Sequence, residues 1–215
     1  KEIECWDELY FAYNCDFRGR IYCSTTGLTP QGNDTAKGLL TFAKAVELGK
    51  TGINWLAIHG ANTYGEDKLS YRKRLEWVQA HEVAIKQTVC DPIGAREFWG
   101  NADKPYQFLA FCMEWANCDY GRDTTATSSL PVGMDGSCNG LQHYSAMLRD
   151  ATGAVSVNLI NTGRPQDIYQ KVADVTTAKL RLEDHPYAHK WLDIGISRKC
   201  TKRAVMTLPY GSTQQ

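Results

Sequence analysis

The sequence predicts a helix-rich α+β protein with little sheet. Long stretches of the chain repeat apolar residues at helical spacing, whereas the stretches with strand character are few and short. Hydrophobic residues make up 43% and charged residues 22% of the 215 positions, which is ordinary for a soluble globular protein. A chain of this length can form one large domain or part of a larger one.

The periodic segments place the elements in order along the chain. Helices are expected over residues 34–48, 52–64, 70–89, 104–117, 165–182 and 187–208, and the LQHYSAML run at 141–148 is also helical in pattern. Asn33 and Asp34 suit the start of the first helix, and Pro165 suits a first helical turn. Short strands are expected over 19–23, 130–134 and 154–159, and a polar loop over 118–129.

Composition and cysteine spacing argue against a membrane protein and a zinc protein. The chain has no apolar run of membrane length and no signal peptide, so no membrane partner is expected. The eight cysteines contain no C-x2-C pair, which disfavours a zinc site, and Cys112 is expected to be a small buried hydrophobe. The chain starts at Lys1 and stops at Gln215, and both ends are interpreted as cuts through a longer protein.

The formal net charge is zero, with 24 basic and 24 acidic residues. A nucleic-acid enzyme then needs local positive potential rather than an overall basic charge. Basic clusters occur at Arg18 and Arg20 and again over 198–203. A third cluster, 72–74, is interpreted as a solvated helix face.

The C-terminal basic cluster has a spacing that suits a nucleotide. Arg198 and Lys202 are four residues apart, so a helix places them on one face, and Tyr210 follows two to three turns later. Two cations followed by an aromatic ring match a ligand with a polyphosphate at one end and a sugar and base at the other. A solvated basic helix end is the plainer alternative, and the spacing alone does not decide between them.

An isolated carboxylate precedes the LQHYSAML segment. The run LPVGM ends at Asp135, which is followed by the small residues Gly136 and Ser137. A carboxylate at a strand end beside glycine can hold Mg²⁺ while the backbone lets a bulky substrate come close. The alternative is that Asp135 or Ser137 merely caps the following helix.

Further motifs accompany these two. They are DFRGR at 16–20, PQGND at 30–34, IHGAN at 58–62, FLAFC at 108–112 and PQDIY at 165–169. In this order, and together with DGSCNGLQHYSAMLRD and R-x3-K-x7-YG, they resemble the single-subunit RNA polymerases of bacteriophages and mitochondria. The resemblance covers almost the whole chain and is closer to the phage branch.

The resemblance implies part of a right-hand-shaped polymerase. Residues 1–45 would be palm, 46–125 an insertion carried on the palm, 126–151 palm with the metal-binding aspartate, and 152–215 the start of the fingers. Asp135 and the Gly136 carbonyl would bind two Mg²⁺ ions. Lys202 would meet the triphosphate and protonate the leaving pyrophosphate, with Arg198 beside it, while Tyr210 would stand against the incoming base pair.

The resemblance also favours RNA over DNA as product. Related DNA polymerases carry a glutamate at the position of Gly140, where it blocks the ribose 2′-hydroxyl; glycine leaves room. Tyr169 matches a tyrosine that supports the hydroxyl of Tyr210, and a buried core tyrosine is its alternative. Pro209 cannot donate a hydrogen bond to Val205 and should end or kink the helix before Tyr210.

Other positions carry weaker implications. Lys68 matches a family position near the nucleotide, although a surface lysine is the plainer interpretation. Arg18 and Arg20 would grip the template or hybrid backbone, or else form a structural pair against Asp16.

Two histidines lie within or beside these motifs. His59 is a weaker candidate for a nucleic-acid contact. His143 is expected to be a packing histidine rather than a catalytic one.

The expected partners are a double-stranded DNA template, an RNA product and NTPs, in an enzyme that is monomeric when complete. Its location would be the cytoplasm of an infected bacterial host, with mitochondria as the alternative. The family's second metal-binding aspartate lies in a His-Asp-Ser segment that this sequence does not contain, so the chain alone should not polymerise. A family-A DNA polymerase and a non-catalytic nucleic-acid-binding piece are the competing hypotheses.

Overall fold

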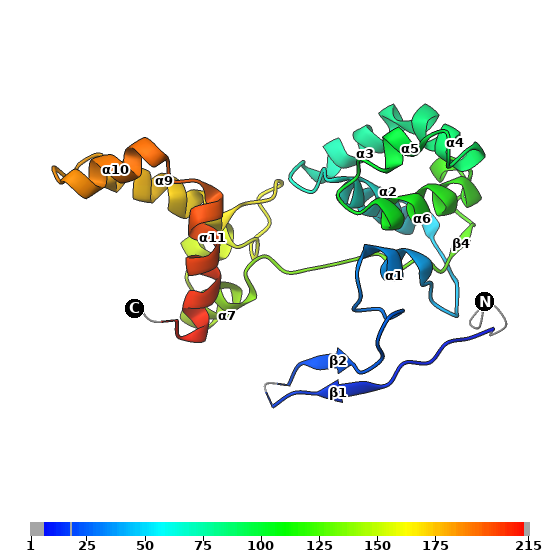
Figure 1. Cartoon of the computed structure of the whole chain (residues 1–215), viewed down its shortest axis with the longest axis horizontal. Helices are drawn as coiled ribbons and strands as arrows, with labels where there is room; N and C mark the ends of the chain where they lie inside the picture. The colour runs from blue at the N-terminus through cyan, green and yellow to red at the C-terminus, as the bar shows by residue number, and fades with distance from the viewer. Residues whose placement is uncertain (1–6, 18, 213–215) are drawn as a thin grey trace. The chain divides into compact units, whose positions relative to one another are not determined.

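The computed structural model describes residues 7–17 and 19–212 (Figure 1). Contacts divide the chain into two compact units, one running to Gly133 and the other starting at Met134. Each unit is described by itself. Among the described residues, no helix combines the length and the apolar character needed to cross a membrane.

The first unit is mostly helical. Its helices are α1 (Asp34–Leu39), α2 (Gly49–Tyr64), α3 (Tyr71–Ala80), α4 (Glu82–Cys90), α5 (Arg96–Trp99), α6 (Pro105–Asn117) and the 3-10 turn η1 (Asp119–Gly121). Two small antiparallel sheets complete it: β1 (Tyr13–Cys15) with β2 (Ile21–Cys23), and β3 (Val46–Glu47) with β4 (Thr127–Ser128).

Helices α2 and α6 form the core of this unit. A Cβ added to Gly60 of α2 would overlap the ring of Phe111 in α6, so only glycine permits this close approach. Phe108, Phe111 and Cys112 are fully buried, and burial raises the pKa of the Cys112 thiol. The IHGAN and FLAFC motifs therefore meet in the core, and the expected burial of Cys112 is confirmed.

The second unit consists of helices alone within its described residues. They are α7 (Asn139–Leu148), α8 (Ala151–Ser156), α9 (Ile168–Leu180), α10 (Pro186–Ile194), α11 (Arg198–Thr207) and the 3-10 turn η2 (Leu208–Tyr210). α11 packs on α9, α7 packs on α8, and α7 also contacts η2 beyond the end of α11 (Figure 1).

Three expected helices are shorter than predicted. The helix expected over 34–48 ends at Leu39, because the backbone that follows pairs with the segment around β4: Phe42 donates to the Ser129 carbonyl at 2.8 Å. The helix over 70–89 divides at His81, whose ring nitrogen lies 2.8 Å from the Trp77 carbonyl. The helix over 187–208 divides at Gly195, which has φ 80°.

Two of the three predicted strands are wrong. The segment 154–159 is not a strand, because Asp150 caps α8 and Asn158 turns the chain with φ 60°. The 130–134 segment has no strand, and the expected loop over 118–129 contains η1 and β4.

Other boundaries shift by a few residues. The 19–23 strand is confirmed as β2 in its second half. The helices expected over 52–64 and 104–117 correspond to α2 and α6. The helix over 165–182 begins at Ile168 rather than Pro165, since Asp167 takes the cap position.

Candidate active site

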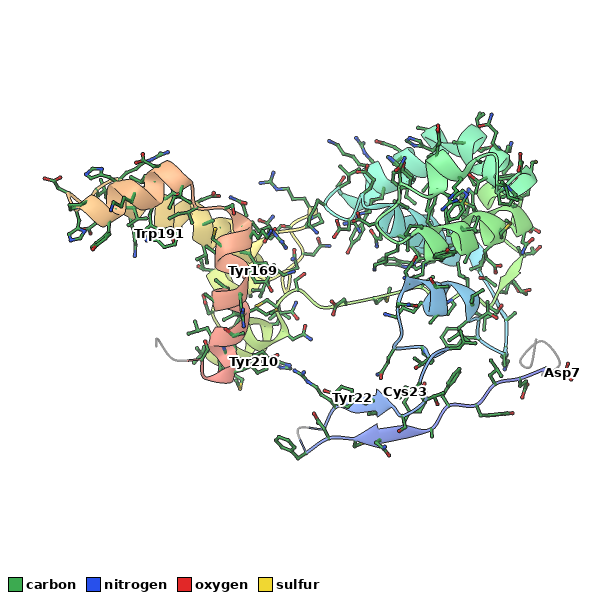
Figure 2. The ribbon with its side chains drawn as sticks, viewed as in Figure 1. Asp7, Tyr22, Cys23, Tyr169, Trp191 and Tyr210 are labelled. Atoms are coloured by element: carbon green, nitrogen blue, oxygen red, sulfur yellow. The ribbon has the colours of Figure 1, made fainter. Side chains whose placement is uncertain are left out.

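Most of the predicted site residues lie in the second unit, on the turn before α7, the start of α9, and α11 with η2 (Figure 2). They are Asp135, Gly136, Gly140, Tyr169, Arg198, Lys202 and Tyr210. Arg20 and Lys68 belong to the first unit. Arg18 lies outside the described residues.

The Asp135 turn is built around a close approach at Gly136. Asp135 is exposed, and its Oδ1 accepts the Gly136 N–H at 2.9 Å. A Cβ at Gly136 would overlap the amide oxygen of Asn139 and lie 3.3 Å from Oε1 of Gln142. Gln142 donates from Nε2 to the Val157 carbonyl at 2.8 Å, which leaves its oxygen as the end that faces Gly136.

The capping alternative for this turn is wrong. The N-cap of α7 is Cys138, in the left-handed conformation and with no side-chain cap bond. Ser137 instead accepts a hydrogen bond from Asn158 Nδ2 at 3.1 Å. The Asp135 carboxylate is therefore not used to hold the start of α7.

The oxygen atoms at this turn are suited to provide some of the ligands of a Mg²⁺ site. The Asp135 carboxylate and the Gly136 carbonyl are hard oxygen ligands, which Mg²⁺ prefers. The described residues contain no group of three or more His, Cys, Asp and Glu side chains that could hold a metal. The turn by itself therefore offers two of the oxygen ligands that a Mg²⁺ site needs.

Arg198 is held in place from two sides. Its Nε is ion-paired with the Asp167 carboxylate, and its guanidinium carbon lies 5.2 Å from the centre of the Tyr169 ring. The other oxygen of Asp167 accepts the N–H of Tyr169 at 3.0 Å and of Gln170 at 3.3 Å. Burial by itself would raise the pKa of Asp167, but the hydrogen bond and charge of Arg198, together with the N–H groups of Gln170 and Tyr169, outweigh it and keep the pKa below its usual value.

Lys202 is exposed one turn after Arg198 on the same helix. Between them, Thr201 donates from its hydroxyl to the Tyr169 carbonyl at 2.7 Å, which pins α11 on the start of α9. The predicted helix with Arg198 and Lys202 on one face is confirmed. The Arg198 side chain is half-buried and held by its partners, whereas the Lys202 side chain is solvated.

Tyr169 contacts Arg198 and Cys138. Burial, followed by the hydrogen bond and charge interaction with Cys138, raises the pKa of Tyr169 to about 12 although Arg198 opposes the rise. The phenol is therefore protonated at neutral pH. Tyr169 and Tyr210 lie toward opposite ends of α11 (Figure 2), and the support of the Tyr210 hydroxyl by Tyr169 stays a prediction.

The chain around Tyr210 leaves the helix as Pro209 predicts. α11 ends at Thr207, and Leu208–Tyr210 forms η2. A Cβ at Gly140 would lie 2.5 Å from Cβ of Pro209, and the hydroxyl of Tyr144 donates to the Pro209 carbonyl at 3.1 Å. The space beside Gly140 is thus occupied by the proline ring, while the Tyr210 side chain is 65% exposed.

Residues to which the sequence analysis assigned no role hold this site together. Asn158 accepts the Gln166 N–H at 2.7 Å and donates to the Gln166 carbonyl at 2.8 Å, so it ties the PQDIY segment to Ser137. Asp167 had a local signal, since an aspartate before an apolar periodic run is a typical N-cap. Tyr144, Thr201 and Asn158 had none, because their partners are distant in the sequence.

The predicted residues of the first unit have mainly local contacts. Lys68 is exposed and ion-paired with the neighbouring Asp67. The backbone N–H of Arg20 donates to Oδ1 of Asp16 at 2.9 Å, closing the β1–β2 hairpin.

The two histidines differ from each other. His59 is 5% exposed, and burial, with a smaller effect of Lys104, lowers its pKa to about 4. Its Nδ1 accepts the Gly133 N–H at 3.3 Å. This burial favours a packing role over a nucleic-acid contact. His143, expected to pack, is exposed instead, because its face of α7 is uncovered within the second unit.

Comparisons with known proteins agree with the motifs. The family model described as DNA-dependent RNA polymerase matches residues 46–215. The DNA-directed RNA polymerase of Enterobacteria phage K11 is 39% identical over 233 residues, covering 96% of this chain and 25% of the relative. T7 RNA polymerase of Escherichia phage T7 is 39% identical, covering 96% of this chain and 26% of the relative.

Mitochondrial relatives match as well. The mitochondrial DNA-directed RNA polymerase of Homo sapiens is 40% identical over 213 residues, covering 95% of this chain and 17% of the relative. The chain thus spans about a quarter of the length of the phage relatives it matches. The ordered motifs, the matching family model and these identities show that the chain belongs to the phage-type single-subunit DNA-directed RNA polymerases.

Proposed function

We propose that this chain supplies the nucleotide-facing part of a DNA-directed RNA polymerase, which adds ribonucleotides from NTPs to an RNA 3′ end on a double-stranded DNA template. One observation carries the proposal: a single compact unit contains the exposed Asp135 turn and the helix α11, which bears Arg198 and Lys202 and leads to Tyr210. This is the constellation that template-directed nucleotide transfer needs, namely oxygen ligands, phosphate-binding cations and a ring for the base.

Each cation has a distinct role in this proposal. The pairing with Asp167 orders Arg198 before substrate arrives, so its remaining N–H groups can neutralise phosphate charge at little conformational cost. Lys202 is exposed, so its ammonium group can meet the triphosphate and donate a proton to the leaving pyrophosphate oxygen.

The Asp135 carboxylate and the Gly136 carbonyl are the residues that would hold Mg²⁺. Bound Mg²⁺ ions stabilise the attacking and leaving oxygens of a phosphoryl transfer. The carboxylate is free for this role because α7 does not use it as a cap. Glycine is required at this turn, since a side chain there would collide with Asn139.

The proposed layout of the right hand follows the family. Residues 1–45 and 126–151 are palm, 46–125 an insertion, and 152–215 the start of the fingers. The relatives include phage and mitochondrial enzymes, and we propose the cytoplasm of an infected bacterium as the place of action. The working enzyme is proposed to be a monomer.

The test is nucleotide incorporation on a primed DNA template. The protein at the full length of its phage relatives should add rNTPs in the presence of Mg²⁺, whereas the 215-residue chain alone should not, because Asp135 needs a second carboxylate. Preference for dNTPs would instead indicate a family-A DNA polymerase. Template binding without incorporation by the full-length protein would indicate a non-catalytic nucleic-acid-binding protein.

A further inference from the structure

The turn that carries Tyr210 is attached to α7 at the residue before Tyr210. Pro209 packs against Gly140, where a Cβ would lie 2.5 Å from Cβ and 2.9 Å from Cγ of the proline. The Pro209 carbonyl accepts the hydroxyl of Tyr144 at 3.1 Å. Gly140 and Tyr144 are four residues apart, so both contacts come from one face of α7.

The other hydrogen bonds of this turn are local, among them two between Thr207 and Ser212. The last helical hydrogen bond of α11 runs from the Leu208 N–H to the Ala204 carbonyl, and Pro209 has no N–H with which to continue the series. The turn is closed by the Gly211 N–H, which donates to the Leu208 carbonyl at 3.1 Å, and Gly211 adopts φ 77°. Leu208 and Tyr210 expose 62% and 65% of their side chains. The contacts with α7 are therefore the ones that tie the turn, and the Tyr210 residue that it carries, to a second helix.

We propose that Tyr144 is a positioning residue for Tyr210. By holding the Pro209 carbonyl on α7, its hydroxyl sets the position of the Tyr210 ring relative to the helix that begins just after the Asp135 turn. This inference rests on the proposed function, because it gives Tyr210 the task of reading the incoming ribonucleotide. The glycine at 140 is then required to admit Pro209, apart from any room that it leaves for a sugar.

The geometry has a direct readout that does not need catalysis. In the full-length protein, Tyr144→Phe removes only the hydroxyl and keeps the ring. Amide hydrogen exchange at Gly211 should become about two- to tenfold faster, the range expected for the loss of one neutral hydrogen bond. Tyr187→Phe is the matched control, since Tyr187 is an exposed tyrosine of α10 in the same unit. It should leave exchange at Gly211 unchanged.

The functional readout is sugar selection. Tyr144→Phe should lower the ratio of kcat/KM for rNTP over dNTP by about two- to tenfold. In a Tyr210→Phe background the same change should have no further effect, because residues that act through one another are non-additive. A merely structural role would shift the melting temperature while leaving this ratio in place.

The outcomes separate the inference from the function on which it rests. If the full-length protein polymerises RNA but Tyr144→Phe leaves both the exchange at Gly211 and the sugar ratio at wild-type values, the positioning role is wrong. It is also wrong if the effects of Tyr144→Phe and Tyr210→Phe on the ratio simply add. If the full-length protein incorporates no nucleotide, the proposed function fails and the sugar-selection role falls with it, whatever the exchange rate shows.

Discussion

The carboxylate of Asp167 holds the guanidinium of Arg198 while it caps α9. One oxygen is ion-paired with Nε of Arg198, and the other accepts the backbone N–H groups of Tyr169 and Gln170. A single side chain therefore fixes both the start of α9 and the first cation of α11. The two tasks can be separated by substitution, since asparagine caps helices well but carries no charge.

Asp167→Ala should lower the free energy of unfolding by about 1–2 kcal/mol, because it removes the cap and the ion pair together. Asp167→Asn should cost less than about 1 kcal/mol, since the cap survives and the lost pair is partly exposed to solvent. Urea denaturation of the 215-residue chain, followed by circular dichroism, measures both. Equal losses in the two variants would show that the ion pair, not the cap, dominates.

His59 should make stability depend on pH. Its folded pKa of about 4 lies below the usual value of about 6.5. Between these two pH values the imidazole is therefore protonated in the unfolded chain and neutral in the folded chain. Stability should be complete above pH 6.5 and fall as the pH drops toward 4, by up to about 3 kcal/mol.

His59→Asn is the matched variant for this prediction, because an amide oxygen can accept the Gly133 N–H and does not titrate between these pH values. Unfolding curves between pH 7 and pH 4 should show a flatter pH dependence for the variant than for the wild type. Carboxylates titrate in both proteins, so only the difference in slope belongs to His59. Parallel slopes would contradict the assignment of a neutral buried imidazole.

The elements that the sequence predicted well are those governed by local chemistry. Asn33 caps α1 through its side chain, which accepts the Ala36 N–H at 3.0 Å, and Pro209 ends α11 as expected. The failures arise where distant backbone intervenes. Residues 40–48 have a helical pattern, yet the pairing of β3 with β4 joins segments about 80 residues apart and overrides the pattern.

The same distinction between local chemistry and distant contacts applies to the predicted site. The helical face of Arg198 and Lys202 follows from spacing alone and is confirmed. The partners that orient it, Asp167 and Thr201, and the contact of Tyr144 with Pro209 depend on how helices pack, which no spacing encodes. Gly140 was interpreted as open space for a sugar, but within the chain that space is filled by Pro209.

Asp135→Asn should abolish most nucleotide transfer by the full-length enzyme while leaving its fold and template binding in place. The carboxamide has nearly the same shape and can still accept the Gly136 N–H, but it lacks the charge that holds Mg²⁺. Incorporation assays and template-binding assays on the same preparation measure the two properties. Turnover near the wild-type level would remove Asp135 from the metal site.

Lys202→Ala should slow the chemical step by on the order of 10²-fold or more, since a positioned acid or charge clamp contributes at least that much. Single-turnover kinetics at saturating NTP measure this step directly. Lys199→Ala is a suitable control, because Lys199 is an exposed lysine of the same helix. A defect confined to KM would reduce Lys202 to uniform binding of the ground state.

We assign the selection of ribose over deoxyribose to Tyr210. With Gly140 in contact with Pro209, no side chain at position 140 excludes a dNTP or an rNTP. We predict that discrimination comes from a polar contact to the 2′-hydroxyl, made by the exposed Tyr210 phenol. A substrate that leaves such a contact unmade loses about 1–3 kcal/mol, or roughly ten- to a hundredfold in kcat/KM.

Tyr210→Phe in the full-length enzyme should therefore keep activity with rNTPs and lose much of the discrimination against dNTPs, because the ring still stacks and only the hydroxyl is gone. Gly140→Ala should behave differently: its Cβ would displace Pro209 and the Tyr210 turn with it, so activity with rNTPs should fall together with the discrimination against dNTPs. Measuring kcat/KM for rNTP and dNTP in the three enzymes tests both expectations. An unchanged ratio in Tyr210→Phe would move sugar selection elsewhere and leave Tyr210 with stacking alone.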